Sequence, residues 1–246
     1  MNKNYKSFIL IILIAATFMM GCDRNISDNT QASIYNIKID ADLKNMDINE
    51  KYFLCGSKIK ELKDSNSDDA AILVNGEKIT IYEIESCRIL TEIFETDDLK
   101  ERINDIIRDK VVESEANKNN IEPDSEELEA YLEQSKTLME TGETPYINEY
   151  IKGRGITQEE YFNELAENEY KIRKNAELYN IILEDWYEKM KNDKNRETDE
   201  NMSDEEYIDK YVDNLVKEAK IEYLNNDIKK SCLNNNVVLY FFNVKK

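Results

Sequence analysis

The sequence predicts a mainly α-helical fold with a small clasp of short strands. Across residues 80–216, apolar residues recur at spacings of three and four, the period of a helix that buries one face. Two short stretches at the ends of this region, residues 71–74 and 219–223, have the apolar or alternating pattern of strands. A lone strand leaves its backbone groups unpaired. We therefore expect 71–74 to pair with 219–223 and to hold the ends of the helical region together.

Capping boxes and chain breakers define the individual helices. Thr80, Thr157 and Ser203 are each followed three residues later by Glu, a pattern typical of a helix start. Gly142 and Pro145 interrupt the chain. The expected helices are 80–94, 97–118, 123–139, a short one from 146 to 151 that stops at Gly153-Arg-Gly155, a long one from 157 to 190, and a last one from 203 to 216.

The chain divides into four parts. Residues 1–21 form an expected lipoprotein signal peptide, and 22–70 form a tether and a small N-terminal segment. Within that segment, alternating residues from Ile37 to Leu43 predict a short strand. Residues 71–224 form the helical domain, in which 191–202 is a polar linker, and 225–246 is a C-terminal tail with an apolar run at 237–242.

The N-terminus carries the signals of a lipid anchor. Lysines 3 and 6 precede thirteen uncharged, mostly apolar residues, a length that suits a secretory signal and is too short to span a membrane. Residues 19–22 (MMGC) resemble a bacterial lipobox. This predicts cleavage between Gly21 and Cys22 and a diacylglyceryl group on Cys22, which anchors the protein to the cell membrane on its extracytoplasmic side. The alternative is an ordinary signal peptide that precedes a chance cysteine.

Composition excludes several classes of function. The chain has 33 Lys and Arg against 52 Asp and Glu, and its net charge of −19 repels nucleic acid. It contains no His, so a Ser-His-Asp triad, a Cys-His pair and a His-ligated metal are excluded. We expect no catalytic residues, no cofactor and no metal.

Three cysteines remain once Cys22 is acylated, namely Cys55, Cys87 and Cys232. Three thiols cannot all pair within one chain. Free thiols are the preferred interpretation, and a single disulfide could form in an oxidising compartment.

Several of these elements, in this order, resemble a known family. Residues 74–80 (VNGEKIT) lead into a helix with the acidic Glu83, and residues 150–161 (YIKGRGITQEEY) contain a Gly-x-Thr-x-Glu-Glu turn. This pattern resembles the N-terminal domain of the PrsA and SurA extracytoplasmic chaperones, in which a strand similar to 219–221 closes the domain. The resemblance covers residues 71–224 and implies a helical chaperone domain.

The chain also departs from that family. PrsA-like foldases insert a parvulin prolyl-isomerase domain between the long helix and the closing helix, and parvulin active sites rely on histidines. Here only residues 191–202 occupy that place, and the chain has no His. Although a homology label could suggest a peptidyl-prolyl isomerase, we expect none.

The resulting hypothesis is binding without chemistry. Fifteen Tyr and seven Met supply flat and adaptable apolar contacts for unfolded or newly secreted polypeptides. Tyr146 and Tyr150, which lie between two chain breakers, are the candidate client-groove residues. An alternative is a surface lipoprotein that uses the same domain as an adaptor for one specific protein partner, and an enzyme is the third class. Promiscuous binding would distinguish the first from the second.

Overall fold

The computed structural model describes residues 37–65, 68–96, 99–192, 202–226 and 228–229. The predicted signal peptide, the lipidation site at Gly21 and Cys22, Cys232 and the apolar run at 237–242 lie outside these residues. Within them the fold is mainly helical with a small antiparallel sheet, as predicted. No helix in the described ranges is both long enough and apolar enough to cross a membrane.

The sheet joins the two ends of the helical domain. Strand β1 (Ala70–Val74) lies between β2 (Glu77–Thr80) and β3 (Ile221–Tyr223), and both pairings are antiparallel. The pairing of Ile72 with Tyr223 confirms the predicted clasp. Strand β2 was not expected from the sequence; it follows a tight turn at Asn75 and Gly76, both with positive φ.

Local signals locate the helix starts correctly. The predicted reciprocal capping bonds form at Thr80–Glu83, Thr157–Glu160 and Ser203–Glu206. The helices are α3 (Ile81–Phe94), α4 (Leu99–Lys118), α5 (Ser125–Glu140), α6 (Pro145–Arg154), α7 (Gln158–Asn192) and α8 (Asp204–Glu218).

The expected strand between Ile37 and Leu43 is wrong. This stretch has no paired strand; it leads into a short 3-10 turn, η1 (Leu43–Asn45), and helix α2 (Ile48–Lys63) follows. An unrecognised capping box between Asp47 and Glu50 starts α2. The N-terminal segment therefore belongs to the helical body, because α2 packs against α3 and α6.

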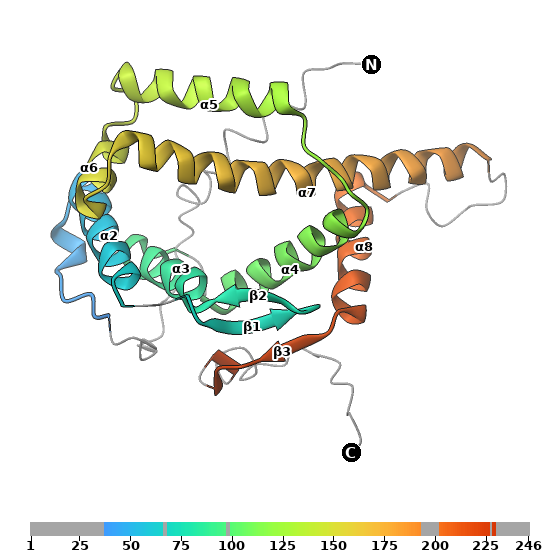
Figure 1. Cartoon of the computed structure of the whole chain (residues 1–246), viewed down its shortest axis with the longest axis horizontal. Helices are drawn as coiled ribbons and strands as arrows, with labels where there is room; N and C mark the ends of the chain where they lie inside the picture. Colours follow the sequence, from blue (N-terminus) through green and yellow to red (C-terminus); the bar gives the residue numbers. More distant parts are fainter. Residues whose placement is uncertain (1–36, 66–67, 97–98, 193–201, 227, 230–246) are drawn as a thin grey trace.

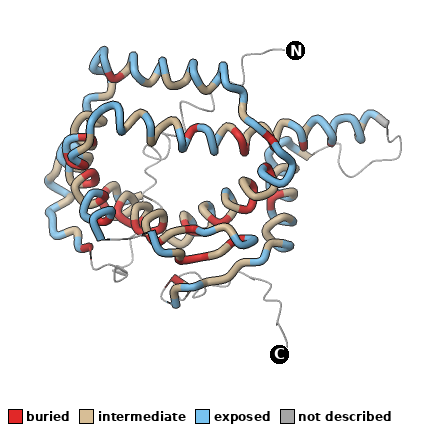
Figure 2. The backbone as a smooth tube through the Cα atoms, in the orientation of Figure 1, coloured by how far each residue is buried: buried red, intermediate tan, exposed pale blue. Residues whose placement is uncertain are grey.

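Figure 1 shows how these elements are arranged. Helix α7 runs along one side with α5 beside it, and α3, α4 and the sheet lie opposite. Helices α2 and α6 connect the two sides at one end, and α8 does so at the other. Figure 2 shows buried residues concentrated in α2, α3, α4 and the sheet, whereas α5 and the last turns of α7 are mostly exposed.

Three hydrophobic clusters hold this arrangement. The first lies between the sheet, α3 and α4 and includes Ile228 from the segment after β3. The second joins α2 to α3 and includes Ile37. The third joins α4, α7 and α8. Tyr207 packs against this third cluster and stacks on the buried Trp186, with ring centroids 4.3 Å apart. Because each cluster uses residues from distant parts of the sequence, the helices support one another rather than standing alone.

Candidate functional site

Helices α2 and α6 cross at very short range. Gly56 of α2 faces the backbone of α6 at residues 150–154, and Gly153 of α6 faces the backbone of α2 at residues 53–57. Without side chains at these two positions, the helix backbones touch. This crossing determines which side chains of α2 and α6 lie at its edges, and those side chains form two features: an aromatic cluster and an open pocket.

The aromatic cluster lies where α2, α6 and the start of α7 meet. The Tyr52 ring lies between two others, with ring centroids 4.9 Å from Phe94 and 4.6 Å from Tyr146. The Tyr161 ring lies 6.4 Å from Tyr150. These distances are typical of tilted and edge-to-face aromatic pairs. We define the aromatic cluster as Tyr52, Phe94, Tyr146, Tyr150, Tyr161 and Phe162.

The two candidate client-groove residues are both members of this cluster. Tyr146 is half-buried against Tyr52, and Tyr150 packs against the core cluster that joins α2 to α3. The Arg154 guanidinium lies 5.9 Å from the centre of the Tyr150 ring and binds both carboxylate oxygens of Glu164. The structure thus brings Tyr146 and Tyr150 together, but their rings contact the chain's own aromatic side chains, and neither lines the pocket described below.

Burial disfavours ionisation of three tyrosines and one thiol in this region. Desolvation raises the pKa of Tyr161 to about 12 and also raises the pKa of Tyr52 and of Tyr150. Cys55, a fully buried free thiol in α2, has its pKa raised to about 12 for the same reason. At neutral pH Tyr52, Tyr150 and Tyr161 are therefore uncharged, and Cys55 is a poor nucleophile.

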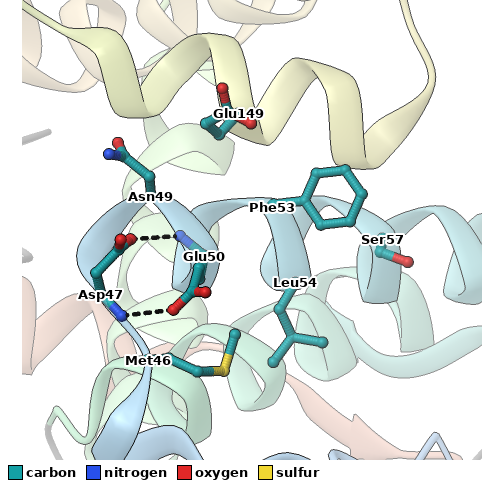
Figure 3. Close-up of a pocket in the computed structure, with 8 residues that line it drawn as sticks. All are labelled: Met46, Asp47, Asn49, Glu50, Phe53, Leu54, Ser57 and Glu149. Carbon is teal, nitrogen blue, oxygen red and sulfur yellow. Dashed lines mark hydrogen bonds between the residues drawn. The ribbon is translucent and has the colours of Figure 1, made fainter.

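The pocket opens beside this crossing and has a volume of about 380 Å³. Figure 3 shows Phe53 and Ser57 along α2, with Glu149 projecting from the facing helix α6. Phe53 is 48% exposed although it is aromatic, and Ile48, five residues earlier in α2, is 53% exposed. We call this the α2–α6 pocket; its lining residues are Met46, Asp47, Asn49, Glu50, Phe53, Leu54, Ser57 and Glu149.

The α2–α6 pocket combines apolar contacts with negative charge. Met46, Phe53 and Leu54 supply the apolar surface. The side chains of Asp47 and Glu50 each accept a hydrogen bond from the other's backbone N–H, and none of the eight lining residues is basic. Glu149 pairs with Lys152 at 2.6 Å. This chemistry suits a ligand that is both apolar and basic.

This pocket was not expected from the sequence. The available signal was the Asp47–Glu50 capping box, which marks the start of the helix that carries Phe53 and Leu54. Among the described residues, no group of His, Cys, Asp and Glu is arranged to hold a metal ion.

Comparisons of the chain with family models, with curated proteins and with solved structures gave no match.

Proposed function

We propose that this protein is a lipid-anchored, extracytoplasmic, chaperone-like protein that binds unfolded or newly secreted polypeptides without prolyl-isomerase chemistry. The α2–α6 pocket is the proposed binding site. The observation that carries the proposal is the exposed Phe53 in one pocket with Met46 and Leu54, whose lining also includes the acidic residues Asp47, Glu50 and Glu149. Exposed apolar side chains gathered within a depression are a common feature of protein interaction sites.

The size of the pocket suits weak and general binding. One buried apolar side chain contributes about 1.5–3 kcal/mol, and ordering a flexible segment offsets part of that gain. Met46 can adapt its shape to different side chains, and Phe53 offers a flat face to any of them. A client held in this way dissociates readily, so release needs no nucleotide.

The topology supports the resemblance to the PrsA and SurA N-terminal domain. A strand, a turn and a capped helix open the domain, and a short strand returns to pair with the first one. The linker between α7 and α8 lies where the isomerase domain is inserted in PrsA-like foldases. We propose that the chain retains the binding domain of such a protein without the inserted enzyme.

An aggregation assay tests the proposal. The mature chain should suppress aggregation of several unrelated unfolded proteins, and Phe53→Ser should weaken that suppression severalfold because the main apolar contact is removed. Ile181→Ser is the matched control, since Ile181 on α7 is 41% exposed and does not line the α2–α6 pocket. Equal losses in the two variants would show that the pocket is not the site.

Two further measurements distinguish the proposed chaperone from an adaptor and from an isomerase. Capture of one folded partner with no effect on unfolded proteins would favour the adaptor function. In a refolding reaction limited by proline isomerisation, we expect the mature chain to leave the slow phase unchanged. Acceleration of that phase would contradict the absence of isomerase activity.

A further inference from the structure

The end of the chain has the opposite charge to the rest of the protein. Residues 228–246 contain Lys229, Lys230, Lys245 and Lys246 and no acidic residue, so they carry +4. Because the whole chain carries −19, residues 1–227 carry −23. Between the two lysine pairs lies the run Val-Val-Leu-Tyr-Phe-Phe at 237–242. The tail therefore has the apolar and basic chemistry that the α2–α6 pocket accepts.

We propose that this tail, residues 228–246, binds the α2–α6 pocket of its own chain as an intramolecular ligand. Phe241 or Phe242 packs on the apolar surface of Met46, Phe53 and Leu54. Lys245 and Lys246 then lie near the carboxylates of the pocket, because three or four extended residues span about 10–13 Å. The inference rests on the proposed function, since it assigns a second ligand to the same site.

The tail is long enough to reach the pocket. Ile228 packs in the cluster that contains Ile81 and Ile84, at the start of α3. Helix α2 packs on Ile89 and Ile93, near the end of α3. A 14-residue helix is about 21 Å long and a neighbouring helix lies about 8–10 Å away, so the path is roughly 30 Å. The 13 residues from 229 to 241 span about 43 Å when extended.

An internal occupant changes how clients bind. A tethered segment acts at an effective concentration near the millimolar range, which a separate polypeptide must match in order to compete. The apparent affinity for clients falls in proportion to the fraction of pockets that are free. The tail thus sets a threshold, so that dilute or weakly apolar segments are rejected and abundant unfolded chains are bound.

Peptide binding tests this inference directly. A fluorescent peptide of residues 233–246 is titrated with the mature chain carrying Cys22→Ser, and anisotropy is recorded. Replacing Phe241 and Phe242 with Asp in the protein frees the pocket and should tighten peptide binding by about tenfold. The matched control replaces Asn234 and Asn235 with Asp, which adds the same charge outside the apolar run and should leave binding unchanged. Equal affinities for all three proteins would overturn the inference.

Photo-crosslinking locates the tail independently of affinity. A benzoyl-phenylalanine placed at position 242 should crosslink within one chain to residues 46–57 or to Glu149, and the yield should fall when salt is raised from 0.05 M to about 0.5 M. Crosslinks to the edge of β3, or to a second copy of the chain, would overturn the inference. Circular dichroism of each variant confirms that the helical fold is intact.

These experiments separate the inference from the function on which it rests. If Phe53→Ser abolishes suppression of aggregation while position 242 does not crosslink to the pocket, the tail proposal fails and the chaperone function stands. If position 242 crosslinks to the pocket while Phe53→Ser leaves suppression unchanged, the tail contact stands and the proposed client site is wrong.

Discussion

Gly56 of α2 and Gly153 of α6 lie opposite each other where the two helices cross beside the proposed site. A Cβ atom on Gly56 would lie 2.2 Å from the carbonyl oxygen of Tyr150, and a Cβ atom on Gly153 would lie 2.1 Å from the carbonyl oxygen of Phe53. Neither position has room for any side chain, because the nearest atoms belong to the opposing backbone. This reciprocal contact brings Phe53 and Glu149 to the same pocket.

Gly153→Ala should therefore separate the two helices. Overpacking of this kind typically costs about 1–3 kcal/mol, and we expect the free energy of unfolding to fall by that amount in a urea titration followed by circular dichroism. Ser57→Ala, one residue after Gly56, is the control and should change stability by less than about 0.5 kcal/mol. A Gly153→Ala protein as stable as the wild type would show that the helices are farther apart than described.

Arg88 links the N-terminal segment to α3 through buried charge. Its guanidinium pairs with the buried Glu85 at 2.9 Å, also contacts Glu92, and donates to the carbonyl oxygen of Ile37 at 2.9 Å. Arg88→Met leaves the Glu85 carboxylate buried without its cation, which should destabilise the fold by about 3–5 kcal/mol.

Proteolysis and thermal melting measure this effect. Because the carbonyl of Ile37 also loses its donor, the Arg88→Met protein should be cleaved faster between residues 37 and 45 as well as melting earlier. Arg102→Met is the control, since Arg102 lies 3.9 Å from the exposed Asp105 and its loss should cost less than about 1 kcal/mol. The double variant Glu85→Gln with Arg88→Met should recover part of the stability, and no recovery would contradict the buried-charge explanation.

Asn75 joins the β1–β2 turn to the closing strand. Its backbone N–H donates to the carbonyl of Lys220, its side-chain oxygen accepts from the Lys220 N–H at 2.9 Å, and its φ is 53°. Asn75→Ala loses the side-chain bond and strains the left-handed backbone, so we expect a loss of about 2 kcal/mol in urea unfolding. Asn75→Gly relieves the strain and should lose only about 1 kcal/mol. If Asn75→Ala and Asn75→Gly lower the free energy of unfolding equally, the left-handed conformation of Asn75 does not affect stability.

The fold should be sensitive to alkali. Folding raises the pKa of Cys55 from 9.0 to about 12 and that of Tyr161 from 10.0 to about 12. Unfolded chains therefore release these protons at lower pH than folded ones do. The part of the free energy of unfolding that comes from these two raised pKa values is fully present below pH 9. It is lost progressively as pH rises towards 12.

Urea titrations at pH 8, 9, 10 and 10.5 should show this decline. The part of the tyrosinate absorbance at 295 nm that comes from Tyr161, obtained by subtracting the signal of Tyr161→Phe, should rise together with loss of helicity rather than before it. Tyr161→Phe removes one of the responsible groups and should flatten the dependence on pH. Complete ionisation of the tyrosines near pH 10 in a chain that stays helical would contradict the burial of the aromatic cluster.

Some elements could be predicted because their signals are local. The capping boxes at Thr80, Thr157 and Ser203 determine helix starts through bonds that span three residues. The clasp could also be predicted, because a strand at each end of a helical region needs a partner. The strand expected at 37–43 was wrong because alternation alone does not supply a neighbouring strand. The helix stop expected at Gly153-Arg-Gly155 is found there: α6 continues through Gly153 to Arg154 and ends at Gly155 in the left-handed conformation.

The sequence by itself determined the helical class, most helix boundaries, and the pairing of β1 with β3, because periodicity and capping act within a few residues. Only the tertiary structure decided that Tyr146 and Tyr150 pack against Tyr52 and Tyr161, and that Phe53 is exposed. The reason is physical: the environment of a side chain depends on which distant helix lies against it. At this site, the environment of these side chains depends on how closely Gly56 and Gly153 allow α2 and α6 to approach each other.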